Sequence, residues 1–191
     1  MSGPVTGEAG QTTALLVIDM QMEMAHRTEA GRDRANPQAE SHIADLLALF
    51  RARRLPVIHV HHSEPGMSIA AGDANAAVMP CARPAPGEAV LVKSASSAFT
   101  GTGLDAHLRA GGIDRIVLVG AVAGFCITST TRSASDLGYR VILPCEALIG
   151  FDLPRADGSR ISAAAVLDVT LALLGADFAQ VMPAIDVATA L

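Results

Sequence analysis

The feature that most limits how this chain can fold is a series of short, continuous apolar runs separated by segments with helical spacing. The clearest runs cover residues 15–18, 89–92 and 116–119. A strand that is apolar at every position is buried on both faces, which is typical of a parallel sheet covered by helices. The pattern therefore predicts an α/β fold: a three-layer α/β/α domain with a Rossmann-like, six-stranded, mainly parallel sheet.

The expected elements alternate along the chain. Strands are predicted near residues 14–19, 56–61, 89–93, 115–120, 140–144 and 178–182, and helices near 37–53, 101–110, 126–137 and 159–174. Asn36 and Pro37 are typical of a helix start, and Gly175 of a helix end. With no linker or internal repeat, residues 1–191 are expected to form a single domain whose residues 1–12 are a disordered tail.

Composition and charge exclude several function classes. The net charge of −5 comes with no basic patch, so nucleic acid is not an expected partner. No run of about 18 apolar residues predicts a membrane-spanning helix. The first residues lack the pattern of a secretory signal, and 3 cysteines are too few and too scattered for a disulfide framework, so a cytoplasmic location is expected.

Three chemically reactive residues stand where apolar strands end. Asp19 and Lys93 directly follow their strands, and Cys126 falls where the strand over 115–120 gives way to a helix. The C-terminal ends of parallel strands meet at one edge of a sheet, where ligands bind. A helix start also favours a thiolate. The alternative interpretation is structural: Cys126 would be a small buried residue, and Asp19 and Lys93 would reach solvent or pair with each other.

Further segments accompany these three residues. They read LLVIDMQ over 15–21, SAFTGTGL over 97–104, GAVAGFC over 120–126 and GYRV over 138–141. Together with Lys93 they resemble the isochorismatase-like cysteine hydrolases, the superfamily that includes nicotinamidase, N-carbamoylsarcosine amidase and streptothricin hydrolase. The likeness spans nearly the whole chain.

The resemblance implies a catalytic triad of Asp19, Lys93 and Cys126. Cys126 would attack the carbonyl of a small amide, lactam or ureido compound, forming a thioester, with Asp19 as acid and base and Lys93 favouring the thiolate. It also implies a cis peptide between Ala121 and Val122, and an oxyanion hole built from the N–H groups of Val122 and Cys126. No cofactor is required. Threonine often stands in the family where this chain has Ala123.

Other residues are candidates for contacts with a small-molecule substrate: Gln21, His62, Phe99 and Phe125. The irregular segment over residues 63–88 is expected to roof the pocket. No metal site is expected, because the nicotinamidases use an Asp-x-His element that this chain lacks, although His59, His61 and His62 cluster on the second strand.

Two other functions remain open at this point. One is isochorismatase-type ether hydrolysis, which does not use a cysteine nucleophile, and the other is a non-catalytic binding protein on the same fold. The resemblance further implies a homodimer or homotetramer. The helix over 161–174 is apolar around more than one face, which fits burial against a second subunit or, alternatively, within one subunit.

Overall fold

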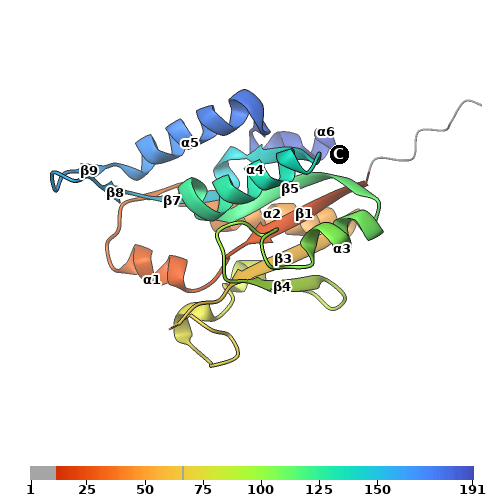
Figure 1. Ribbon diagram of the computed structural model, residues 1–191, viewed down its shortest axis with the longest axis horizontal. Coiled ribbons are helices and arrows are strands. Elements are labelled where there is room, and N and C mark those ends of the chain that lie inside the picture. The colour runs from red at the N-terminus through yellow and green to blue at the C-terminus, as the bar shows by residue number, and fades with distance from the viewer. Residues whose placement is uncertain (1–11, 66) are drawn as a thin grey trace, which may run out of the picture.

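The fold is a twisted sheet with helices on both faces (Figure 1), which confirms the predicted three-layer α/β/α class. It is seen in a computed structural model that describes residues 12–65 and 67–191. The tail expected over residues 1–12 lies outside the described residues except for Thr12, which begins the first strand.

Six strands form the body of the sheet in the order β10-β6-β5-β1-β3-β4, and every neighbouring pair is parallel. These are the six predicted strands: β1 (Thr12–Ile18), β3 (Val57–His62), β4 (Ala89–Lys93), β5 (Ile113–Ala121), β6 (Arg140–Pro144) and β10 (Gln180–Met182). Among the described strands, β4 pairs only with β3 and so forms one edge of the sheet.

The sheet is larger than predicted, because two short strands extend it to eight. β7 (Leu148–Phe151) pairs in parallel with the end of β5, and β2 (Arg34–Ala35) pairs antiparallel with β7. Both are too short to show a hydrophobic period in the sequence. A separate two-stranded hairpin joins β8 (Leu153–Pro154) to β9 (Arg160–Ile161), and it projects from one end of the molecule (Figure 1).

Helices cover the two faces of the sheet unequally. The helices are α1 (Glu23–Glu29), α2 (Ala39–Ala52), α3 (Leu104–Ala110), α4 (Thr128–Asp136), α5 (Ala163–Asp177) and α6 (Val187–Ala190). Leu16 and Ile18 of β1 pack in the cluster that includes residues of α3, α4 and α5, whereas Leu15 and Val17 pack with α2. Among the described residues, no helix combines the length and apolar character needed to cross a membrane.

Two details of the helices differ from the prediction. α1 was not expected, because its residues lack an apolar stripe and only Met24 is buried. Gly175 does not end a helix but lies inside α5. A Cβ at that position would meet Cγ2 of Val181 at 3.3 Å, so the glycine permits close packing of α5 on β10.

One glycine brings the ends of the two central strands together. Gly120 lies opposite Ile18 in the register of β1 and β5, with a φ of +115°. A Cβ on Gly120 would meet the carbonyl oxygen of Ile18 at 2.1 Å, so no other residue fits without movement of the backbone. Because the backbones of Gly120 and Ile18 approach so closely, the residues that follow β5 lie beside Asp19, which follows β1.

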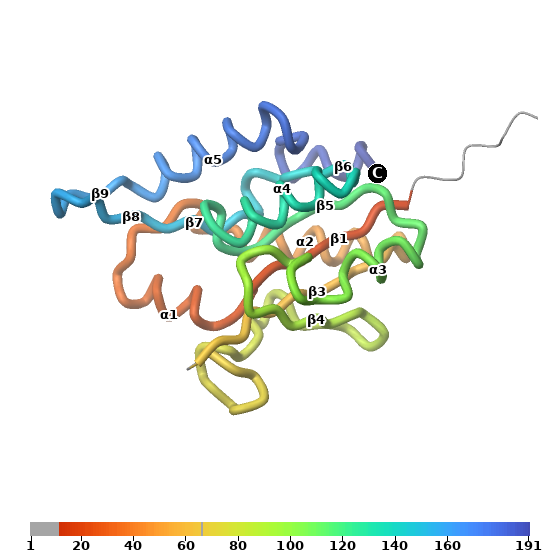
Figure 2. Tube along the Cα trace, in the orientation of Figure 1, coloured from red at the N-terminus to blue at the C-terminus, as the bar shows by residue number. Residues whose placement is uncertain are grey.

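The segment between β3 and β4 is held against the end of β1. The N–H of Met22 donates to the carbonyl of Ala77, and the N–H of Met79 donates to the carbonyl of Met20. Two 3-10 turns, Ala74–Ala76 and Pro80–Ala82, lie within this segment, which runs below the sheet in the trace of Figure 2.

Two histidines of β3 are buried in the folded chain, where an imidazole is harder to protonate. His59 and His61 are fully or almost fully buried, and among the described residues the Nδ1 atom of neither has a hydrogen-bond partner. Nε2 of His59 lies 2.9 Å from Glu88, whose carboxylate also binds Arg51. Burial lowers the pKa of both imidazoles, that of His61 to about 4.

We therefore expect a His61→Leu variant to lose less stability on acidification than the unmodified protein. The unfolded chain binds a proton at His61 near pH 6.5, and the folded chain only near pH 4, so stability is lost as pH falls through that window. The difference should reach about 2 to 3 kcal/mol between pH 7.5 and pH 4.5. Urea unfolding at both values measures it. The matched exposed variant His107→Leu should behave like the unmodified protein, and equal acid losses in all three proteins would contradict the prediction.

Candidate active site

Asp19, Lys93 and Cys126 converge at the C-terminal edge of the sheet. Asp19 follows β1, Lys93 ends β4, and Cys126 follows β5. Nζ of Lys93 lies 2.8 Å from Oδ2 of Asp19 and 3.3 Å from Sγ of Cys126. The Lys93 side chain is fully buried and that of Asp19 nearly so. The ammonium group therefore stands between the carboxylate and the thiol.

Cys126 lies in a wider turn than the α-helix that was predicted to begin there. It belongs to a π-helical turn, Ala123–Ile127, that continues directly into α4. The N–H groups of Phe125 and Ile127 both donate to the carbonyl of Val122, at 2.9 and 3.3 Å. The peptide bond between Ala121 and Val122 is cis.

The turn that contains Ala123 accepts a hydrogen bond from a nearby hydroxyl group. Ala123 is fully buried, and its carbonyl oxygen accepts a hydrogen bond from the Thr128 hydroxyl at 2.7 Å. A hydroxyl is therefore supplied to the turn from the first residue of α4.

Electrostatics at the cluster differ from the sequence-based expectation of a thiolate. Burial, and then the negative charge of Asp19, raise the pKa of the Cys126 thiol to about 11, although Lys93 acts in the opposite direction. Burial also raises the pKa of Asp19, again against the influence of Lys93. Both groups therefore hold a proton more tightly than they would in water.

Asp19 keeps one acceptor atom free. Its Oδ1 is buried, and it has no hydrogen-bond partner within the part of the chain that the structure describes. A buried acceptor without a partner is costly in a folded protein. Such an atom is suited to accept a proton or to bind an N–H group of a ligand.

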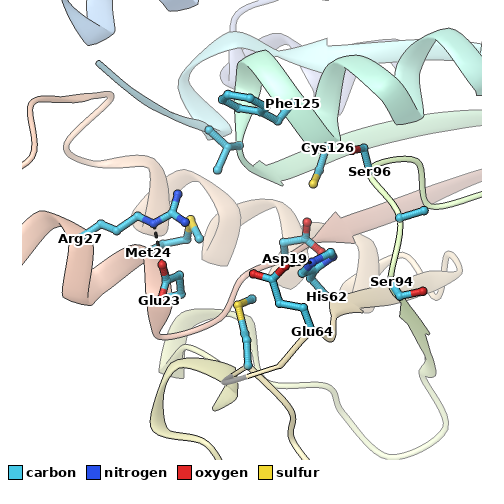
Figure 3. A pocket seen from close by; sticks show the side chains of 13 residues that line it. Asp19, Glu23, Met24, Arg27, His62, Glu64, Ser94, Ser96, Phe125 and Cys126 are labelled. Atoms are coloured by element: carbon cyan, nitrogen blue, oxygen red, sulfur yellow. Dashed lines mark hydrogen bonds and ion pairs between the residues drawn. The ribbon is translucent and has the colours of Figure 1, made fainter. Parts of the chain in front are cut away.

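A cavity of about 490 Å³ opens beside this cluster, as Figure 3 shows. The volume fits a small molecule. Its wall is formed by Asp19, Glu23, Met24, Arg27, His62, Glu64, Met67, Ser94, Ala95, Ser96, Val122, Phe125 and Cys126. The sulfur atom of Cys126 points into the space above Asp19 and His62 in this view.

Of the four predicted substrate contacts, His62 and Phe125 line the cavity and the other two do not. Gln21 is fully buried, and its amide donates to the carbonyls of His62 and Ala76 at 3.0 and 3.1 Å. Phe99 is partly buried against the core, and its ring stacks on that of Tyr139 with 5.8 Å between the ring centroids. Both side chains are held by neighbouring protein groups, which keeps them off the cavity wall. Val122, a predicted oxyanion donor, does line it.

Sequence reasoning missed the wall that α1 contributes. Glu23 and Arg27 are one helical turn apart and form an ion pair of 2.7 Å at the cavity. Their spacing of four residues was a usable signal for a helix. The segment over 63–88 reaches the cavity with Glu64 and Met67, so only its first part takes the expected place over the pocket.

The histidines of β3 divide between the two faces of the strand. His62 lines the cavity, whereas His59 contacts Glu88, which is not part of the wall. Among residues 12–65 and 67–191 there is no group of three His, Cys, Asp or Glu side chains that could hold a metal ion. All three cysteines are free thiols.

Comparison with known proteins places these features in one family. Residues 13–170 match the model of the isochorismatase domain. Streptothricin hydrolase of Streptomyces noursei is 32% identical over 144 residues, which are 75% of this chain and 51% of that protein. Maleamate amidohydrolase of Pseudomonas putida is 31% identical over 158 residues, 73% of either chain. A crystal structure from Chromobacterium violaceum, assigned to the isochorismatase family, is 36% identical, covers 100% of this chain and 98% of its own, and superposes with a TM-score of 0.87.

Proposed function

The chain belongs to the isochorismatase family of hydrolases, and on that premise we propose that it cleaves a C–N bond of a small amide, lactam or ureido compound by way of a thioester on Cys126. The observation that carries the proposal is the buried cluster of Asp19, Lys93 and Cys126 at the wall of a cavity of substrate size. Relatives named maleamate amidohydrolase and N-carbamoylsarcosine amidase support the choice of bond.

The first half of the proposed reaction forms the thioester. Asp19 takes the proton of the Cys126 thiol as the sulfur attacks the carbonyl carbon, giving a tetrahedral intermediate with a negative oxygen. The N–H groups of Val122 and Cys126 would donate to this oxygen, and one such donor is worth roughly 3 kcal/mol in the transition state. Asp19 then returns the proton to the nitrogen, the C–N bond breaks, and the amine leaves.

The second half releases the acid. A water molecule gives a proton to Asp19 and attacks the thioester carbonyl, and the C–S bond breaks as the proton passes to sulfur. The enzyme returns to its resting thiol and carboxylate. The raised pKa of both groups suits this cycle, because one proton is exchanged between Asp19 and the sulfur at each half-reaction. The reaction requires no metal or organic cofactor. A reducing compartment such as the cytoplasm suits it, since all three cysteines are free.

Isochorismatase-type ether hydrolysis is the alternative within the family. It does not need a nucleophilic sulfur, whereas here the thiol lies at the cavity wall and 3.3 Å from a buried ammonium. A non-catalytic binding protein would use the unpartnered Oδ1 of Asp19 as an acceptor for its ligand, but it would not need a thiol and a carboxylate that share one buried ammonium group. Both features favour C–N hydrolysis.

Trapping of the acyl-enzyme tests the proposal. The protein is incubated with a panel of small primary amides, lactams and ureido compounds, quenched in acid and digested for mass spectrometry. We expect the peptide that contains Cys126 to gain the mass of the acyl group, together with release of ammonia or amine. Hydrolysis of a panel compound without any adduct on Cys126 across the time course would contradict the thioester mechanism.

We also propose that the chain forms a homodimer or homotetramer through α5. Val169 and Leu173 on this helix are 58% and 56% exposed, and Phe125 on the neighbouring turn is 51% exposed. The turn and the helix touch, since Gly124 approaches Val166. An apolar face of this kind is suited to a subunit interface.

Light scattering at micromolar concentration measures this assembly. We expect a mass of two or four times the 19.6 kDa of one chain, and we expect Leu173→Glu to lower it because a charge cannot be buried unpaired in an interface. The control is Ile185→Glu, at an apolar residue that is 84% exposed elsewhere on the surface, and it should leave the mass unchanged. A single-chain mass for the unmodified protein would refute the oligomer.

A further inference from the structure

The ammonium group of Lys93 has a third partner besides Asp19 and Cys126. Its Nζ lies 3.2 Å from Nδ1 of His62. A lysine ammonium carries three hydrogens, and here three acceptors surround it: a carboxylate oxygen, a thiol sulfur and a ring nitrogen. Because the Lys93 side chain is fully buried, this arrangement provides every N–H bond with a partner inside the protein.

The contact with Lys93 determines which ring nitrogen of His62 carries the hydrogen. A hydrogen on Nδ1 would point at the ammonium group, so we assign it to Nε2 and leave Nδ1 as the acceptor. Nε2 lies 3.4 Å from Oε2 of Glu64, a carboxylate that favours an N–H group facing it. The neighbours on both sides of the ring therefore agree on the same tautomer.

The backbone of His62 is held from the other side by Gln21. The N–H of His62 donates to Oε1 of Gln21 at 2.7 Å, and Nε2 of Gln21 donates to the carbonyl of His62 at 3.0 Å. Gln21 is fully buried and stands two residues after Asp19. His62, which contacts Lys93, is thus tied to the segment after β1 that supplies the Asp19 carboxylate.

We propose that His62 is a positioning residue: by accepting the third hydrogen of Lys93 it holds the ammonium group between Asp19 and Cys126, and Gln21 holds His62 in register. Without Nδ1 of His62, one N–H bond of the Lys93 ammonium would have no acceptor, and the ammonium would turn toward the cavity. The ammonium would then spend less time near the sulfur, and it would favour the thiolate less. The predicted effect on turnover rests on the proposed function, whereas the effect on the thiol does not.

The test compares two variants of the same shape. In His62→Asn the side-chain oxygen occupies roughly the place of Nδ1 and remains an acceptor, whereas His62→Leu has no acceptor. The first measurement is the rate at which iodoacetamide alkylates Cys126 at pH 8, followed by peptide mass spectrometry. The second is kcat and KM on an amide found by the panel above. The control is His107→Leu on the exposed face of α3. If His62→Leu does not fold, His62→Ala replaces it.

We expect His62→Leu to alkylate roughly tenfold more slowly than the unmodified protein, since less thiolate is present. Its kcat should fall roughly ten- to a hundredfold with little change in KM, and His62→Asn should recover most of both losses. Unchanged alkylation in His62→Leu would overturn the proposal, as would a rise in KM alone, which would make His62 a substrate contact. If no amide is turned over, the proposed function fails, but the alkylation rates still decide the role of His62.

Discussion

Cys126→Ala is expected to reduce hydrolysis of the substrate by a factor on the order of 10⁴ to 10⁶, because the variant has no atom to form the thioester. Alanine is small enough to fit the π-helical turn, so the fold should remain intact. The measurement is kcat/KM on an amide found by acyl-enzyme trapping, with the thermal unfolding midpoint recorded on the same sample. The residual rate would come from binding and from the oxyanion donors alone.

The other two cysteines provide the control for this experiment. Cys81 and Cys145 do not line the cavity, so neither sulfur lies where a substrate carbonyl would be bound. Cys81→Ala and Cys145→Ala should therefore retain most of the activity. A Cys126→Ala protein with a rate within tenfold of the unmodified enzyme would show that the sulfur is not the nucleophile.

Asp19→Asn is expected to lower kcat/KM by a factor of roughly 10² to 10⁴, because the amide has the shape of the carboxylate but cannot take up the thiol proton. The pH profile provides a second readout. Protonation of Asp19 removes the base as pH falls, and because burial raises the pKa of this carboxyl group, activity should decline at a pH above the ordinary range for aspartate. The Asn variant should lack this acidic limb.

The matched control is Asp45→Asn, at an exposed carboxylate of α2, which should preserve both the rate and the limb. If Asp19→Asn kept the same acidic limb as the unmodified enzyme, another group would have to be the base. Thermal unfolding of the variant separates a loss of chemistry from a loss of structure, since Asp19 also pairs with buried Lys93.

The parts of the fold that the sequence predicted are those that depend on local pattern. Four of the six predicted strands, β1, β4, β5 and β6, are apolar over several consecutive positions. The three reactive residues stand at or just after the ends of β1, β4 and β5, so parallel pairing alone brings them to one edge. β7 and β2 went unnoticed because two to four residues carry no period. The part of the cavity wall formed by Glu23 and Arg27 was not predicted either, because α1 buries only Met24 and so shows no apolar stripe in the sequence.

Properties of the site that depend on packing could not be predicted from the sequence. The thiol of Cys126 was expected to ionise easily beside Lys93, yet burial outweighs that influence and raises its pKa to about 11. Gln21 was expected at the substrate, and only the fold shows that its amide meets the backbone of a residue 41 positions away. Burial and long-range hydrogen bonds arise from the whole tertiary structure, which local pattern does not contain.

Lys93 enters the active site from β4, the edge strand, which pairs only with β3 among the described strands. Edge strands open locally at a lower free energy than the centre of a sheet, and Val90 and Val92 of β4 are already about half exposed. Separation of this one strand would withdraw the ammonium group while β1 and β5 still held Asp19 and Cys126 in place. The cluster of Asp19, Lys93 and Cys126 can therefore be taken apart without global unfolding, and we expect mild denaturation to remove Lys93 from it before the core of the sheet unfolds.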